Sequence, residues 1–136
     1  MSKFDNFLDK SGIARSTGYE FYFKNYIFDN INLENKNILD LGGGNGLASF
    51  FALNASSSCS SWVVDPILEG SNEMMWRQYN TMKEKFDPSR INFHRDFIDT
   101  LSSPEKFDII LMHNSINHIG EDIIKDVLTN PRLYDE

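Results

Sequence analysis

The feature that most constrains this chain is a short apolar run that ends in glycines. Residues 37–41 (Asn-Ile-Leu-Asp-Leu) lead directly into Gly42-Gly43-Gly44-Asn45-Gly46. An apolar run of this length that stops at glycines predicts a buried β-strand. Glycines permit a tight turn, and they let the backbone approach a ligand without an intervening Cβ. We therefore expect a strand, a glycine loop and a helix whose first N–H groups are free.

The chain after the glycine loop alternates between strand and helix patterns. Short apolar runs predict three further strands, and helical spacing of apolar residues predicts three helices. The strands are 62–64, 91–94 and 107–112, and the helices are 45–54, 71–86 and 121–128. This alternation predicts a parallel sheet with helices on both faces, an α/β fold. Ligands of such sheets bind at the carboxyl ends of the strands, so the residues that follow each strand are the candidates for a site.

The first thirty residues predict helices. Thr17 and Glu20 have the spacing of a capping box, at the start of a helix that ends near Asp29. A weaker pattern predicts a helix over residues 3–10. The apolar stripe of the longer helix consists of Tyr19, Tyr22, Phe23, Tyr26 and Ile27. A stripe at this spacing is typical of a helix that packs on the core.

Composition and charge limit the partners. The chain has 136 residues, which suffice for one domain with one core, and its formal net charge is −7. An acidic chain lacks the basic surface that nucleic acids and anionic membranes need, and no apolar run approaches the roughly 18–20 residues of a membrane span. We therefore expect neither partner. Cys59 is the only cysteine and the N-terminus has no signal-peptide pattern, so we expect a cytoplasmic protein.

The spacing of the glycines distinguishes between nucleotide-binding loops. The dinucleotide fingerprint G-x-G-x-x-G/A needs a Gly or Ala where this chain has Leu47, counted from Gly42, or Ser49, counted from Gly44. The pattern G-x-x-x-x-G-K-[ST] of phosphate-binding loops is absent as well. The spacing argues against an NAD enzyme. An ordinary glycine-rich turn remains the structural alternative.

Residues 38–46 resemble the first motif of the class I S-adenosylmethionine-dependent methyltransferases, in which an acid lies two residues before G-x-G-x-G. The resemblance implies a Rossmann-like fold, S-adenosylmethionine as cofactor and S-adenosylhomocysteine as product. It implies that Asp40 and the loop backbone hold the methionine end of the cofactor. The loop positions that match the motif are Gly42, Gly44 and Gly46.

The acid at the end of the second strand has a matching role in this family. Asp65 lies where the family has an acid that accepts hydrogen bonds from both ribose hydroxyls. The resemblance then places Pro66 and Ile67 against the adenine. A solvated acid at a strand end is the alternative for Asp65.

The third strand is followed by a further acid. In the family, an acid here often accepts a hydrogen bond from the adenine amino group, and the next backbone N–H meets the ring. Asp96 and Phe97 match these two positions, and Asp99 is close enough to take the place of Asp96.

Two histidines follow the fourth strand, where the family's fourth motif faces both the cofactor and the substrate. The resemblance makes His118 and His113 the candidates for a general base, since imidazole titrates near neutral pH. Packing and helix capping are the alternative for His118, and lining the pocket is the alternative for His113. Asn114 is a candidate contact to the cofactor. No metal is expected, because the sequence has no cluster with metal-ligand spacing.

The resemblance covers residues 37–119, whereas the family sheet has seven strands. We therefore expect one domain with the first four strands, in order 3-2-1-4: N-terminal helices in 1–30, a cofactor-binding core in 37–119, and a last helix and tail in 120–136. N-terminal helices of this family often cover the ligand, which is the alternative role for the three tyrosines of the stripe. In this truncated sheet the fourth strand is an exposed apolar edge, which predicts a homodimer through it.

Two functions follow from these expectations. The first is an S-adenosylmethionine-dependent methyltransferase, partial or minimal, that methylates oxygen, nitrogen or carbon of a small molecule. The second is a non-catalytic module that binds S-adenosylmethionine or serves assembly.

Overall fold

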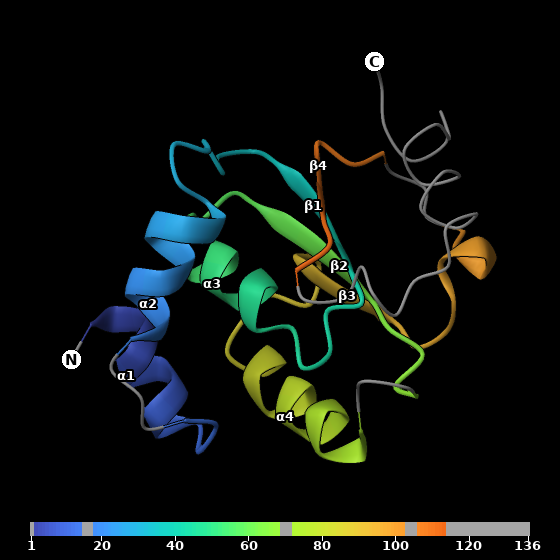
Figure 1. Cartoon of the computed structure of the whole chain (residues 1–136), viewed down its shortest axis with the longest axis horizontal. Helices are drawn as coiled ribbons and strands as arrows, with labels where there is room; N and C mark the ends of the chain where they lie inside the picture. Colours follow the sequence, from blue (N-terminus) through green and yellow to red (C-terminus); the bar gives the residue numbers. More distant parts are fainter. Residues whose placement is uncertain (1, 15–17, 69–71, 103–105, 114–136) are drawn as a thin grey trace.

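Four parallel strands form the central sheet, in the order β3-β2-β1-β4 (Figure 1). The structure, a computed structural model, describes residues 2–14, 18–68, 72–102 and 106–113. The strands are β1 (Asn37–Leu41), β2 (Ser60–Val64), β3 (Ile91–His94) and β4 (Ile109–Leu111). The strand order and the parallel pairing confirm the predicted α/β sheet. The described α-helices all pack on one of its faces, so helices on both faces stay a prediction. The predicted helix over 121–128 lies outside the described residues.

The two faces of the sheet carry separate hydrophobic clusters because side chains alternate along each strand. Ile38 and Val63 belong to the cluster under the helices, whereas Leu39 and Val64 belong to the cluster on the opposite face. The second cluster is completed by residues that follow β3, including Ile98 of the short 3-10 helix η2 (Ile98–Thr100).

Four helices contribute to the larger cluster. They are α1 (Lys3–Lys10), α2 (Tyr19–Tyr22), which continues as η1 (Phe23–Ile27), α3 (Leu47–Ala55) and α4 (Glu73–Lys83). Phe4 of α1 packs edge-on against Phe23 and Phe51, with ring centroids 6.1 and 5.5 Å away. The N-terminal helices therefore share one core with the sheet.

The two N-terminal helices cap each other. Asp5 Oδ1, on α1, accepts hydrogen bonds from the backbone N–H groups of Tyr19 (3.0 Å) and Glu20 (3.2 Å), at the start of α2. Glu20 Oε1 in turn accepts a hydrogen bond from the backbone N–H of Phe4 at 3.2 Å. The predicted capping box implies that Glu20 caps its own helix, whereas its side chain caps α1 instead. Thr17, the other residue of the predicted box, lies outside the described residues. This exchange joins the first turns of the two helices.

The predicted helix of the tyrosine stripe is short and irregular. After four residues α2 becomes a π-helical turn, closed by a hydrogen bond from Phe28 N–H to the Phe23 carbonyl at 2.8 Å. Phe23 is buried, whereas 37% of Tyr22 and 69% of Tyr26 is exposed. The stripe is therefore core only in part, and Tyr22 remains accessible. Turns of this type frequently occur at functional sites.

No helix in the described part of the chain is both long enough and apolar enough to span a membrane. Within the described sheet β4 is an edge strand, and the homodimer through this edge stays a prediction.

Candidate functional site

The loop between β1 and α3 adopts the backbone conformation that its glycines allow. Gly42, Gly44 and Gly46 have φ angles of 70°, 57° and 81°, in the left-handed region that side chains other than glycine rarely adopt. The loop is joined to the neighbouring strand by a hydrogen bond from Gly42 N–H to the Val64 carbonyl at 2.7 Å. The three positions that match the family motif are therefore the three that need glycine for the turn.

Gly43 lies directly over the side chain of Asp40. A Cβ at Gly43 would come within 2.7–2.8 Å of all three atoms of the Asp40 carboxyl group. Asp40 is only 1% exposed, and burial raises its pKa to about 6. The loop thus passes at contact distance over a buried acid that lines the cavity described below. A cationic group bound there would stabilise the ionised carboxylate.

Two buried serines form a hydrogen-bonded chain that ends at Asp40. Ser49 Oγ donates a hydrogen bond to Asp40 Oδ2 at 2.6 Å, and it lies 2.7 Å from Ser61 Oγ. Both serines have no exposed surface, and Ser61 Oγ also reaches the Ile38 carbonyl at 3.4 Å. Sequence reasoning missed this pair. The only available signal was a serine between apolar residues on the buried face of the predicted helix.

Asp65, at the end of β2, is directed at backbone rather than at the cavity. Its Oδ2 accepts a hydrogen bond from Gly44 N–H at 2.8 Å, and its Oδ1 accepts one from Ile67 N–H at 2.7 Å. Ile67 has a φ of 55°, which is a strained value for a β-branched residue. The carboxylate therefore fixes both the glycine loop and the bend after β2, with Pro66 half-buried between them. Its role at the ribose stays a prediction.

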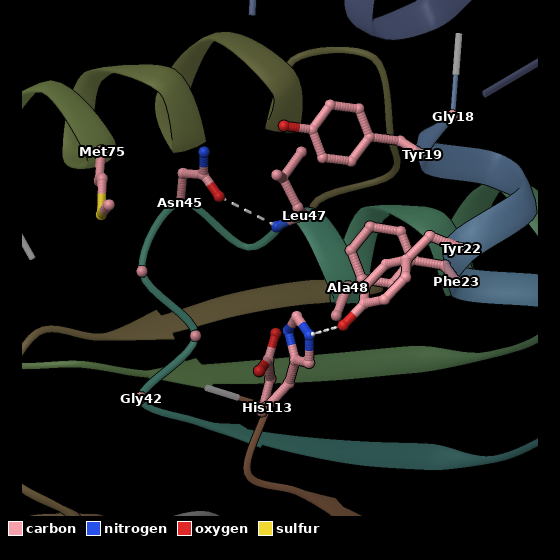
Figure 2. A pocket seen from close by; sticks show the side chains of 13 residues that line it. Gly18, Tyr19, Tyr22, Phe23, Gly42, Asn45, Leu47, Ala48, Met75 and His113 are labelled. Atoms are coloured by element: carbon pink, nitrogen blue, oxygen red, sulfur yellow. Dashed lines mark hydrogen bonds between the residues drawn. The ribbon is translucent and has the colours of Figure 1, made fainter. Parts of the chain in front are cut away.

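A cavity of about 550 Å³ opens between the glycine loop, α2 with η1, and the end of β4 (Figure 2). The loop contributes Gly42 to Asn45, and the floor contributes Asp40. The N-terminal helices contribute Tyr19, Tyr22 and Phe23, so two of the three tyrosines of the stripe line the cavity. Their role in covering a ligand stays a prediction. Tyr26 does not line the cavity. Met75 of α4 and His113 complete its rim.

His113 lies at the cavity beside Tyr22. Its Nε2 is 2.7 Å from the Tyr22 hydroxyl oxygen, and Figure 2 marks this hydrogen bond with a dashed line. The His113 ring also packs against the rings of Tyr22 and Phe23, with centroids 5.6 and 5.8 Å away. Partial burial lowers the pKa of His113 below its ordinary value, which favours the neutral ring. The sequence placed His113 near the cofactor, but it did not predict Tyr22 as its partner.

The residues predicted to bind adenine lie away from this cavity. Asp96 and Phe97 are exposed, Phe97 to 54%, and Asp96 Oδ1 accepts a hydrogen bond from Phe97 N–H at 2.7 Å. The neighbouring Arg95 pairs with Glu73 and lies over the Trp76 ring, 5.1 Å from its centroid. The adenine role stays a prediction, and His118 and Asn114 lie outside the described residues.

The described residues fit the methionine end of S-adenosylmethionine, which carries an ammonium group. The Asp40 carboxylate lines the cavity, and the backbone of Gly43 passes so close to it that there is no room for a Cβ at this position. The described parts of the chain contain no group of three or more His, Cys, Asp or Glu residues that could hold a metal ion.

Comparisons with known proteins bear on the fold. No family model and no curated protein sequence matches the chain. A crystal structure from Pyrococcus horikoshii, described as an RNA methyltransferase, matches 81% of this chain and 56% of its own, with 14% identity and a TM-score of 0.54. Protein arginine methyltransferase 10 of Arabidopsis thaliana matches 79% of this chain and 30% of its own, with 19% identity and a TM-score of 0.45. The chain thus spans little more than half of the first structure. Together with the sheet order β3-β2-β1-β4, the first match shows that the chain has the Rossmann-like fold of the class I methyltransferases, in its N-terminal, four-stranded portion.

Proposed function

We propose that this chain is the cofactor-binding portion of an S-adenosylmethionine-dependent methyltransferase that acts on a small molecule. The observation that carries the proposal is the buried acid beneath the glycine loop. Asp40 contributes a carboxylate to the cavity wall, and the loop crosses it at a distance that only glycine allows at position 43. An ordinary glycine-rich turn needs no such acid.

Each end of the cofactor has a proposed partner. Asp40 binds the ammonium group of the methionine end, since a buried carboxylate gains most from a cation. Asp65 binds the ribose, because it lies at the carboxyl end of β2, where ligands of parallel sheets bind, and it holds the neighbouring glycine loop through Gly44 N–H. Asp96 and Phe97 bind the adenine from the exposed side of β3.

The bound cofactor supplies a methyl group activated by a sulfonium, and the protein supplies binding and orientation. The aromatic wall of Tyr19, Tyr22 and Phe23 holds the acceptor beside the loop. His113 or His118 removes the acceptor's proton. Holding the two reactants in near-attack geometry accounts for much of the rate of such a transfer.

A small acceptor fits the charge of this chain better than a nucleic acid does. The net charge is −7, and none of the described residues that line the cavity is Lys or Arg. An RNA substrate would need a basic surface. The names of the two similar structures refer to RNA and protein substrates, and this chain is proposed to differ from both.

The alternative function is a module that binds the cofactor without turnover. The chain spans 56% of the Pyrococcus structure, so methyl transfer by this chain is a proposal separate from cofactor binding. Titration with S-adenosylmethionine, followed by an assay for S-adenosylhomocysteine with small acceptors, separates the two functions. Binding with turnover supports the methyltransferase, binding without turnover supports the module, and no binding of S-adenosylmethionine contradicts both.

A further inference from the structure

Tyr22 and His113 form a polar pair in an otherwise aromatic wall of the cavity, although they lie 91 residues apart in the chain (Figure 2). The hydroxyl of Tyr22 is 2.7 Å from His113 Nε2. Tyr22 is 37% exposed and lines the cavity, so a bound molecule can reach its oxygen. The π-helical turn that begins at Phe23 directly follows this tyrosine.

The pair is able to accept a proton. Partial burial lowers the pKa of His113, so its ring is neutral near pH 7 and one nitrogen carries a free lone pair. When Nδ1 carries the ring proton, Nε2 accepts the hydrogen bond from the Tyr22 hydroxyl. The oxygen of Tyr22 then keeps lone pairs that face a molecule in the cavity.

The rest of the wall selects the kind of molecule. The ring of Tyr19 stacks on Phe23 with centroids 6.4 Å apart, and the ring of Tyr22 meets Phe23 edge-on at 5.4 Å. Flat aromatic ligands pack well on such rings. None of the described residues that line the cavity is Lys or Arg, so this part of the lining offers no cation to a phosphate or carboxylate of the methyl acceptor.

We propose that Tyr22 and His113 act as a two-residue proton relay, and that the methyl acceptor is an uncharged aromatic compound with a free hydroxyl group. This inference rests on the proposed function. The acceptor's hydroxyl proton passes to the Tyr22 oxygen while the Tyr22 proton passes to His113 Nε2. The acceptor oxygen forms the new O–CH₃ bond with a lone pair, and the electron pair of the broken S–CH₃ bond stays on sulfur. The positive charge of the sulfonium is thereby replaced by that of the imidazolium.

A hydroxyl fits this relay better than an amine. A phenol and the side chain of a tyrosine carry the same kind of hydroxyl group, so the proton moves between them with little cost. A hydroxyl is also a weak nucleophile until a base takes its proton. A neutral amine attacks with its own lone pair and gains little from a base before transfer.

The test uses the full chain with 2-naphthol as probe and 2-methoxynaphthalene, which has the same rings but no hydroxyl proton, as its control. The variants are Tyr22→Phe and His113→Gln, and the matched control is Tyr26→Phe, an exposed tyrosine on the same helical segment that does not line the cavity. Calorimetry with S-adenosylmethionine comes first, and binding of both probes is then measured with S-adenosylhomocysteine present.

We expect wild type and Tyr26→Phe to bind 2-naphthol equally, and Tyr22→Phe to bind it about tenfold more weakly, the effect of one lost hydrogen bond. Wild type, Tyr26→Phe and Tyr22→Phe should all bind 2-methoxynaphthalene with the same affinity. Nitrogen NMR should find the His113 proton on Nδ1 in wild type and moved toward Nε2 in Tyr22→Phe. With S-adenosylmethionine, wild type should convert 2-naphthol to 2-methoxynaphthalene, with kcat reduced at least about tenfold in Tyr22→Phe and His113→Gln and the KM for S-adenosylmethionine unchanged.

Binding of S-adenosylmethionine with no preference for 2-naphthol, or with Tyr22→Phe equal to wild type, would overturn the relay and leave the proposed function standing. Identical nitrogen NMR spectra of His113 in wild type and Tyr22→Phe would also overturn the relay and leave the proposed function standing. Failure to bind S-adenosylmethionine would overturn the proposed function and the relay with it.

Discussion

The carboxylate of Asp65 accepts a hydrogen bond from the backbone N–H of Gly44, with 2.8 Å between oxygen and nitrogen. One acid at the end of β2 thereby positions the loop that follows β1. Its second oxygen accepts a hydrogen bond from Ile67 N–H at 2.7 Å, and the side chain is only 4% exposed. Asp65 thus joins the carboxyl ends of two neighbouring strands, where ligands of parallel sheets bind.

Replacing Asp65 by Ala should weaken the binding of S-adenosylmethionine by about 1.5–3 kcal/mol, the range for hydrogen bonds to a charged group. The variant should also lose roughly 1–3 kcal/mol of folding free energy, because two backbone N–H groups lose their acceptor. Calorimetry and urea denaturation measure the two losses. An affinity equal to that of wild type would rule out the ribose role.

Replacing Gly43 by Ala should disturb Asp40 directly. The new Cβ would lie within 2.7–2.8 Å of the carboxyl atoms, so either the acid or the loop must move. We expect the affinity for S-adenosylmethionine to fall by about 1–3 kcal/mol, the usual cost of overpacking. The control is Gly12→Ala, where a Cβ meets nothing within 4 Å but a φ of +70° strains the backbone. Gly12→Ala should lose stability and bind S-adenosylmethionine as tightly as wild type does. If Gly43→Ala bound S-adenosylmethionine as tightly as Gly12→Ala, a role for the loop in binding would be contradicted.

The pH dependence of stability should reveal the buried Asp40. Its pKa in the folded chain is about 6, above the ordinary value of 3.8, so the folded state binds this proton more tightly than the unfolded state. Stability should therefore fall as pH rises from about 4 to about 6, by roughly 3 kcal/mol from this group. Below about pH 4, Asp40 is protonated in both the folded and the unfolded chain, so it no longer makes stability depend on pH.

The matched variant for this prediction is Asp40→Asn, which keeps an acceptor for the Ser49 hydroxyl and cannot ionise. Urea denaturation across the pH range should show the variant gaining on wild type by roughly 3 kcal/mol between about pH 4 and pH 6.5. A constant difference between the two proteins would mean that Asp40 titrates at its ordinary pKa.

Removing the cap that α1 provides for α2 should loosen the aromatic wall of the cavity. Asp5→Ala leaves the N–H groups of Tyr19 and Glu20 without their acceptor, and we expect a loss of about 2 kcal/mol. Hydrogen exchange should accelerate over residues 19–23. Asp9→Ala, at an exposed position of the same helix, is the control and should change neither quantity. Unchanged exchange in Asp5→Ala would show that packing alone holds α2.

The strands were predictable because their signals are local. The apolar run 37–41 and the glycines after it determine β1 and its turn without reference to the rest of the chain. The strand order follows from the family resemblance that the glycine spacing carries. The fourth strand is shorter than its apolar run, since Phe107 packs into the smaller cluster and Asp108 N–H bonds the Asn37 carbonyl just before β4 begins.

The features of the site that the sequence did not predict depend on contacts between residues that lie far apart in the chain. Nothing local marks Tyr22 as the partner of His113, because the pair exists only once α2 and the end of β4 lie side by side. The buried bond from Ser49 to Asp40 likewise needs α3 to pack over β1. The π-helical turn after Tyr22 left no sequence signal, since its residues have ordinary helical spacing.

Cofactor binding by the 136-residue chain is measured by calorimetric titration with S-adenosylmethionine and S-adenosylhomocysteine, with NAD as the control. We expect both sulfur compounds to bind with micromolar affinity and NAD not to bind, and we expect Asp40→Asn to weaken the binding of both sulfur compounds. Absence of binding by both sulfur compounds, or equal binding of NAD, would contradict the assignment of the glycine loop and Asp40 to this cofactor.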